Sequence, residues 1–269
     1  MGHGDMRTIY GLALRRARAR IALLAIGFAL FELVVGLSYA SVDQNAIRQL
    51  VEALPPALRA LAGSADIASP TGYAGSGYLH PVALAIQAAV AISMAAAPAR
   101  ETEDGTAELV LSRPLPPARW LGAHALAMAT GLAVVVAGGY AGGLAAAAAV
   151  DDLAPVDAGP LAAAAVAGFL CFLALGGVTL LVSSAVRTGG GAVGWAAGFL
   201  LVSYATDYLA QVWSIAEPLG PLSVFHYLDP PAILGGAGLG AGDAAALLGL
   251  AVVTAALALV RIERRDLTP

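Results

Sequence analysis

The charged residues of this chain gather in one short stretch, "RETEDGTAELVLSRPLPPARW", at positions 100–120. It contains three arginines and the acids Glu101, Glu103, Asp104 and Glu108, although only 12% of the chain is charged. The acids come first, where a helix N-terminus favours negative charge, and Pro114 makes its predecessor a helix end. Leu109, Val110 and Leu111 add an apolar patch. The pattern predicts a short helix that docks onto a partner; a solvated charged loop is the alternative.

Residue types that carry catalysis or hold cofactors are sparse. The chain has no lysine, so it lacks the P-loop lysine that reaches the phosphates of a bound nucleotide. The four histidines show no metal-ligand pairing, and no GxSG motif of an intramembrane serine protease is present. The net charge of −4 argues against a nucleic-acid partner. We expect no catalytic, cofactor-binding or metal site here, and no enzyme activity of the chain by itself.

Glu32 is the most polar residue within the apolar segments, and it lies near the middle of the first one. An ionised carboxylate there costs about 2.5–3.5 kcal/mol on insertion scales, so it should face protein or water instead of lipid. Two interpretations stay open. Glu32 marks the path of a transported substrate, or it is a protonated or hydrogen-bonded acid packed against a neighbouring Ser, Gln or Tyr.

The elements that position these residues are strongly apolar. The chain is 59% hydrophobic with a mean hydropathy of +0.80, against about 45–50% apolar residues in soluble domains. A membrane helix needs about 20 apolar residues. Six segments qualify, at about 21–40, 79–99, 121–150, 160–185, 190–210 and 243–261. None alternates as a barrel strand does, so the sequence predicts an all-α integral membrane protein with six transmembrane helices.

The arginines predict the orientation of these helices. Every basic residue is an arginine, and only Arg48 and Arg59 of the 14 fall in segments on the side opposite the N-terminus. Cytoplasmic loops carry the excess of positive charge in membrane proteins. Both termini and the 100–120 stretch are therefore predicted to be cytoplasmic.

Three segments outside the spans carry their own patterns. Met6–Arg20 predicts a basic amphipathic helix on the inner leaflet, with a plain stop-transfer flank as the alternative. The outer segment 41–78 predicts two short surface helices, from the helical spacing of Ile47, Leu50, Val51, Leu54, Leu58 and Leu61. The Pro-rich segment 211–242 is too apolar for a free loop, so it predicts an outer re-entrant or surface-lying hairpin.

Glycines recur at the spacing that allows close packing of membrane helices. Gly138, Gly139, Gly142 and Gly143 form two overlapping GxxxG pairs, and Gly190, Gly194 and Gly198 form two more. We expect both runs to pack within one chain instead of forming a dimer seam.

The segment "RETEDGTAELVLSRPLPPARWLGAHAL" resembles the cytoplasmic signature of the type-2 ABC exporter permeases. The resemblance extends to the basic N-terminal helix, the six spans, the "LSVFHYLDPPAILGG" segment and the "ERRDL" tail. The sequence departs from the usual pattern at Val110, where Leu is commoner, and at "PLPPAR".

The resemblance implies one transmembrane permease domain over 1–269, in the plasma membrane of a bacterial cell, that exports drugs or antibiotics. Its implied partners are a second permease copy or a homologous permease, and separate ABC ATPase subunits that bind ATP and Mg²⁺. The implied cytoplasmic coupling helix uses Glu101, Glu103, Asp104, Gly105, Thr106, Glu108 and Arg113. The alternative function is an integral-membrane enzyme or scaffold without pump activity.

Overall fold

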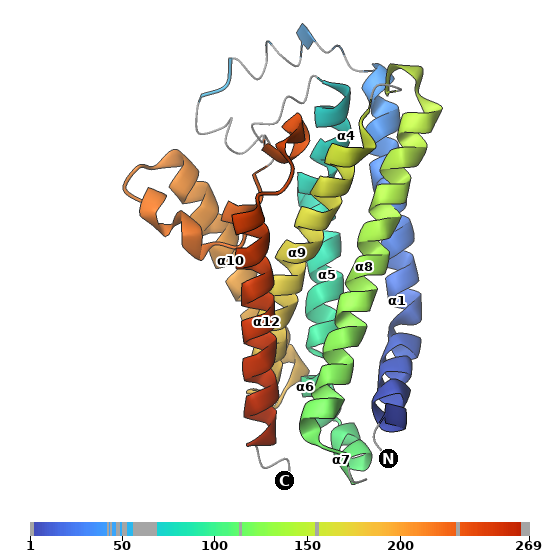
Figure 1. The fold of residues 1–269 in the computed structure, drawn as a ribbon, viewed down its shortest axis with the longest axis vertical. Coiled ribbons are helices and arrows are strands. Elements are labelled where there is room, and N and C mark those ends of the chain that lie inside the picture. The colour runs from blue at the N-terminus through green and yellow to red at the C-terminus, as the bar shows by residue number, and fades with distance from the viewer. Residues whose placement is uncertain are drawn as a thin grey trace.

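The computed structural model describes residues 3–41, 43, 45–46, 49, 53–55, 69–112, 115–153, 156–229 and 232–264, and no strand occurs among them. Long helices stand side by side, and α1 begins and α12 ends at the same end of the bundle (Figure 1). The short helices α6 and α7 share that end, which we call the α7 end; α4 lies at the other, the α4 end. The elements are α1 (His3–Ser38), η1 (Tyr39–Ser41), α4 (Pro70–Leu79), α5 (Pro81–Ala95), α6 (Ala97–Glu103), α7 (Thr106–Leu111), α8 (Pro117–Ala149), η2 (Asp151–Leu153), α9 (Ala158–Ser183), α10 (Gly189–Val212), η3 (Glu217–Leu222), η4 (Phe225–Tyr227), η5 (Ile233–Ala237) and α12 (Ala241–Glu263).

Five stretches of the described chain are helical, long and apolar enough to cross a membrane. They are Met6–Ser41, Pro70–Ala95, Pro117–Ala149, Ala158–Ser183 and Ala241–Glu263. The all-helical fold is therefore confirmed for the described residues, and these five stretches are candidate membrane spans. The segment predicted as the fifth of six spans forms α10, which has the length of a span but whose glycines, tyrosines and Asp207 lower its mean hydropathy. The count of six spans stays a prediction.

The path of the chain around α10 bears on that count. The backbone N–H of Gly189, where α10 begins, donates to Glu103 at the α7 end. Further along the chain, Leu234 of η5 packs against Gly75 of α4, at the opposite end. The chain therefore runs from one end of the bundle to the other between these two contacts. At about 1.5 Å per residue, the 24 residues of α10 extend about 36 Å, which is enough for that passage.

Two elements differ from the sequence prediction. Met6–Arg20 does not form a separate surface helix, because α1 continues unbroken from this basic segment into the first span, with no proline to interrupt it. The second span begins earlier than position 79, as α4, and breaks at His80–Pro81. The Ser69 side chain accepts a hydrogen bond from Gly72 N to cap α4, and Pro70 and Pro81 suit the first turns of α4 and α5.

The close contact between α1 and α8 depends on glycine. A Cβ atom at Gly138 would lie 2.7 Å from the Ala25 carbonyl oxygen, and one at Gly142 would collide with the carbonyl of Ala29. Packing of this glycine run within one chain is thereby confirmed. The prediction is wrong for Gly190, Gly194 and Gly198, since a Cβ at any of them would meet no atom of the described chain within 4 Å.

The Pro-rich segment after α10 packs into the bundle through short helical turns. Ser203 of α10 bonds to Ser223 and to the backbone N–H of Val224, the latter at 2.9 Å. The Phe225 ring stands edge-on to Phe172, 6.3 Å between centroids, midway along α9. A hairpin that re-enters the membrane would bring Phe225 to the middle of α9 in this way. The choice between a re-entrant and a surface-lying hairpin stays a prediction. In the outer segment, Ile47, Leu50, Val51, Leu58 and Leu61 lie outside the described residues.

Candidate functional site

The 100–120 stretch forms two short helices joined by a tight turn. α6 ends at Glu103, α7 begins at Thr106, and Asp104 and Gly105 make the turn between them. Gly105 has φ of 71°, the left-handed conformation that glycine adopts most readily. The predicted helix therefore exists as an angled pair, because the Asp-Gly turn interrupts it before the apolar patch.

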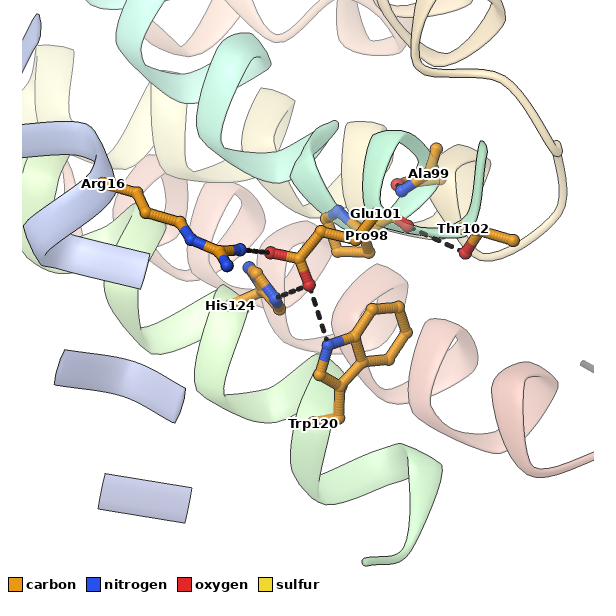
Figure 2. A network of polar contacts seen from close by, with 8 residues as sticks. Arg16, Pro98, Ala99, Glu101, Thr102, Trp120 and His124 are labelled. Atoms are coloured by element: carbon orange, nitrogen blue, oxygen red, sulfur yellow. Dashed lines mark hydrogen bonds and ion pairs between the residues drawn. The ribbon is translucent and has the colours of Figure 1, made fainter. Parts of the chain in front are cut away.

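Glu101 does not face outward but binds side chains from two long helices. Arg16 Nη1 on α1 donates to its Oε1 at 2.9 Å, and Trp120 Nε1 on α8 donates to its Oε2 at 3.1 Å. His124 Nε2 lies 3.2 Å from the same Oε2, and since a carboxylate only accepts, Nε2 carries the proton. Figure 2 shows the three side chains converging on the carboxylate from α1 and α8.

The electrostatics of Glu101 favour its charged form. Burial raises the pKa of this carboxyl, but the hydrogen bonds and positive charge supplied by His124, Trp120 and Arg16 outweigh burial. The net result is a pKa below the ordinary value for glutamate. Trp120 is fully buried and stands edge-on to His124, so the donors are held in place by packing.

α6 is bonded to two further helices. The Glu103 carboxylate accepts a hydrogen bond of 2.8 Å from Gly189 N at the start of α10, where the helix dipole favours negative charge. The backbone N–H of Ala99 donates to the Ser183 hydroxyl of α9 at 3.0 Å. Through these bonds and Glu101, α6 connects directly to α1, α8, α9 and α10.

Other residues of the predicted coupling set lie on the surface. Asp104 and Glu108 are exposed, while Gly105 and Thr106 are half-buried. Leu109 is 75% exposed although it is apolar, and Ala107 on the inner side of α7 is buried. Arg113 lies outside the described residues. Within the predicted set, Glu101 and Glu103 are therefore bonded to other helices, although Glu103 is exposed, whereas Asp104 and Glu108 are exposed without such bonds. We call the surface formed by Asp104, Glu108 and the neighbouring Leu109 the α7 surface.

Glu32 lies far from this site, near the α4 end of α1. Sixteen residues separate it from Arg16, which is about 24 Å along a helix. Its side chain is 1% exposed and packs on Gly77, and neither of its carboxylate oxygens has a hydrogen-bond partner among the described residues. The hydroxyl of neighbouring Tyr78 is likewise unpartnered there. A hydrogen-bonded Glu32 is thus not found in the described structure, whereas a protonated, packed acid and a place on a substrate path both stay predictions.

The roles of Arg16, Trp120, His124 and Ser183 were not predicted from the sequence. The four-residue spacing of Trp120 and His124 places both on one face of a helix, and this was the available signal. Arg16 is 85 positions from Glu101, so no local pattern joins them. Within the described part of the chain, no group of three or more His, Cys, Asp or Glu side chains is placed to hold a metal ion.

Comparison with known proteins identifies the family. The family model described as "Multidrug efflux system permease Rv1217c, C-terminal domain" matches residues 6–262. No curated protein and no solved structure matches the chain. Because the match extends over nearly the whole bundle, including α6 and α7, the chain belongs to the family of the multidrug efflux system permease Rv1217c C-terminal domain.

Proposed function

We propose that this chain is the transmembrane permease subunit of an ATP-driven ABC exporter. The observation that carries the proposal is the arrangement of α6 and α7, which combines an exposed acidic and apolar surface with direct bonds to four long helices. In a docking element, the exposed Leu109 side chain would be buried against the partner, whereas in a solvated loop it would stay in contact with water.

The mechanism follows from those bonds. A separate ATPase subunit binds the α7 surface, with basic groups opposite Asp104 and Glu108 and an apolar groove for Leu109. When ATP binding and hydrolysis move that subunit, α6 moves with it. Glu101 then pulls on α1 and α8, while Glu103 and Ala99 pull on α10 and α9. The movement at one end thereby changes the packing of the spans.

The partner supplies the nucleotide chemistry. With no lysine anywhere in the sequence, the chain has no P-loop, and ATP and Mg²⁺ bind to the ATPase subunit. The chain itself is not an enzyme. It has six spans, of which α10 is the fifth, in a bacterial plasma membrane, and the α7 end with both termini faces the cytoplasm. The family name supports drug export as the function of the complex.

A second permease copy, of this chain or a homologue, packs on α10. Gly190, Gly194 and Gly198 lie exposed on α10 with nothing of the described chain near them. Trp195 is 69% exposed on the same helix. Small residues at this spacing allow two membrane helices to approach closely. The exposed run therefore suits the seam of a dimer.

The test removes charge from the α7 surface. The tagged chain is expressed in its native cells, and the copurifying P-loop ATPase is quantified for wild type and for Asp104→Asn with Glu108→Gln. An acid that loses a desolvated partner at an interface costs about 2–5 kcal/mol, so we expect recovery of the ATPase to fall about tenfold or more. Insertion and thermal stability should not change, because neither side chain is bonded within the described chain.

The matched control is Asp151→Asn with Glu217→Gln, which removes two exposed acids far from α7. We expect wild-type recovery of the ATPase with this control. Wild-type recovery with the α7-surface variant as well, or the absence of any ATPase from the wild-type preparation, would overturn the proposed function.

A further inference from the structure

A small cavity of about 70 Å³ opens at the α7 end, between α1, α5, α6 and α8. Its walls carry Arg16 and Arg20 from α1, Arg100 and Glu101 from α6, Ser93 from α5 and His124 from α8. The lining contains three arginines and one carboxylate, so the cavity carries an excess of positive charge. Arg16 and Glu101 belong to the network of Figure 2, whereas Arg20 and Arg100 do not.

The one acid of the cavity is already fully engaged. Both Glu101 oxygens are bonded, one to Arg16 and the other to Trp120 and His124. The guanidinium groups of Arg20 and Arg100 form no hydrogen bond or ion pair with any described residue. They also lie close enough for their like charges to interact unfavourably. An anion between them would relieve that repulsion.

The chemistry of the walls selects the anion. Guanidinium groups bind phosphate oxygens through two parallel hydrogen bonds, and Arg20 and Arg100 supply two such groups here. Basic pockets between membrane helices on the cytoplasmic side suit anionic lipid head groups. Leu12 and Leu23 of α1, near the cavity along the chain, are 41% and 72% exposed, as expected of a surface that meets acyl chains. We propose that this cavity binds a phosphate group, supplied by the head group of an anionic phospholipid.

The site has a direct connection to the coupling network. Arg16 lines the cavity and also forms the ion pair with Glu101. A phosphate in the cavity competes with Glu101 for Arg16 while holding Arg20 and Arg100 together. Bound lipid therefore acts on the junction of α1 and α6 without touching the α7 surface.

The experiment measures lipid retention directly. The full chain is reconstituted in nanodiscs of equal parts phosphatidylcholine and phosphatidylglycerol, and lipids that remain bound are counted by native mass spectrometry. We expect wild type to be enriched in phosphatidylglycerol, and Arg20→Gln with Arg100→Gln to reduce that enrichment about tenfold. The control, Arg15→Gln with Arg18→Gln, removes as many charges from α1 outside the cavity and should retain it.

Two further measurements distinguish loss of the site from misfolding, and a lipid phosphate from free phosphate. Arg20→Lys with Arg100→Lys keeps both charges but not the paired hydrogen bonds, so it should keep more of the enrichment than the Gln variant and less than wild type. A loss in the Gln variant that is larger than in the Lys variant is not misfolding. Thermal stability in detergent with added inorganic phosphate tests the other source. If phosphate stabilises wild type but not the Gln variant, and no phosphatidylglycerol is enriched, the cavity binds free phosphate and the lipid source is wrong. Equal losses in the Gln variant and its control, or no loss in either, overturn the site.

Discussion

The charge of the Glu101 carboxylate holds α1, α6 and α8 together at the α7 end. Replacing Glu101 with Gln removes the ion pair to Arg16 and weakens the bonds from Trp120 and His124. Hydrogen bonds to charged groups are worth about 1.5–3 kcal/mol, so we expect a loss of this size in unfolding free energy. Thermal unfolding in detergent measures it. Glu263→Gln, which alters an exposed acid of α12, is the control and should unfold as wild type does.

The same carboxylate gives this effect a pH dependence of definite sign. Its bonds hold the pKa of Glu101 below the ordinary value in the folded state. The contribution of Glu101 to the unfolding free energy is therefore complete above the pKa of glutamate in the unfolded chain, about 4.3. It is lost as the pH falls through the lower pKa of Glu101 in the folded chain. The difference in unfolding temperature between wild type and Glu101→Gln should be constant at neutral pH and shrink in acid. A difference that persists at the lowest pH contradicts this assignment.

At the scale of helices, α8 approaches the α1 backbone closely because Gly142 has no side chain. A Leu at this position would collide with the carbonyl of Ala29. Overpacking of this kind typically costs about 1–3 kcal/mol, so Gly142→Leu should lower the unfolding temperature of the purified chain. Gly249→Leu introduces the same side chain on α12, where a Cβ meets nothing within 4 Å. That control should be neutral, and equal stability of the two variants would argue against close α1–α8 packing.

The sequence was sufficient for most helix bounds, because membrane helices are long apolar segments between polar flanks. The spans predicted at 121–150 and 160–185 correspond to α8 (Pro117–Ala149) and α9 (Ala158–Ser183). The start of the second span was missed because α4 is rich in Gly, Ser and Thr, which carry little hydropathy. The direction of the Glu101 side chain, toward the bundle, could not be predicted from the sequence. A short charged helix has no apolar period to show which side faces the bundle, and its partner Arg16 comes from a distant helix.

For the molecule as a whole, the path of the chain predicts which residues a reagent reaches from outside the cell. Arg187 comes two residues before Gly189, which bonds to Glu103 at the α7 end, and Ala241 begins α12, whose last turn lies at the α7 end (Figure 1); both residues are exposed. A membrane-impermeant maleimide should label Ala241→Cys in intact cells and Arg187→Cys only after permeabilisation. Native Cys171 is buried and should give little background. Labelling of both positions from outside would mean that the chain does not cross the membrane between them.

The exposed glycines of α10 allow dimer assembly to be tested independently of the folding of the single chain. Gly194→Leu places a large side chain on the α10 run where the described chain offers no contact, so the unfolding temperature of the monomer should not change. If α10 forms the dimer seam, the same side chain separates the two helices and the dimer fraction falls. Single-molecule photobleaching of labelled chains in lipid vesicles measures that fraction. Gly249→Leu, on the open side of α12, should leave it unchanged. If Gly194→Leu dimerises as wild type does, the second permease copy binds elsewhere, and the exposed glycines of α10 face lipid.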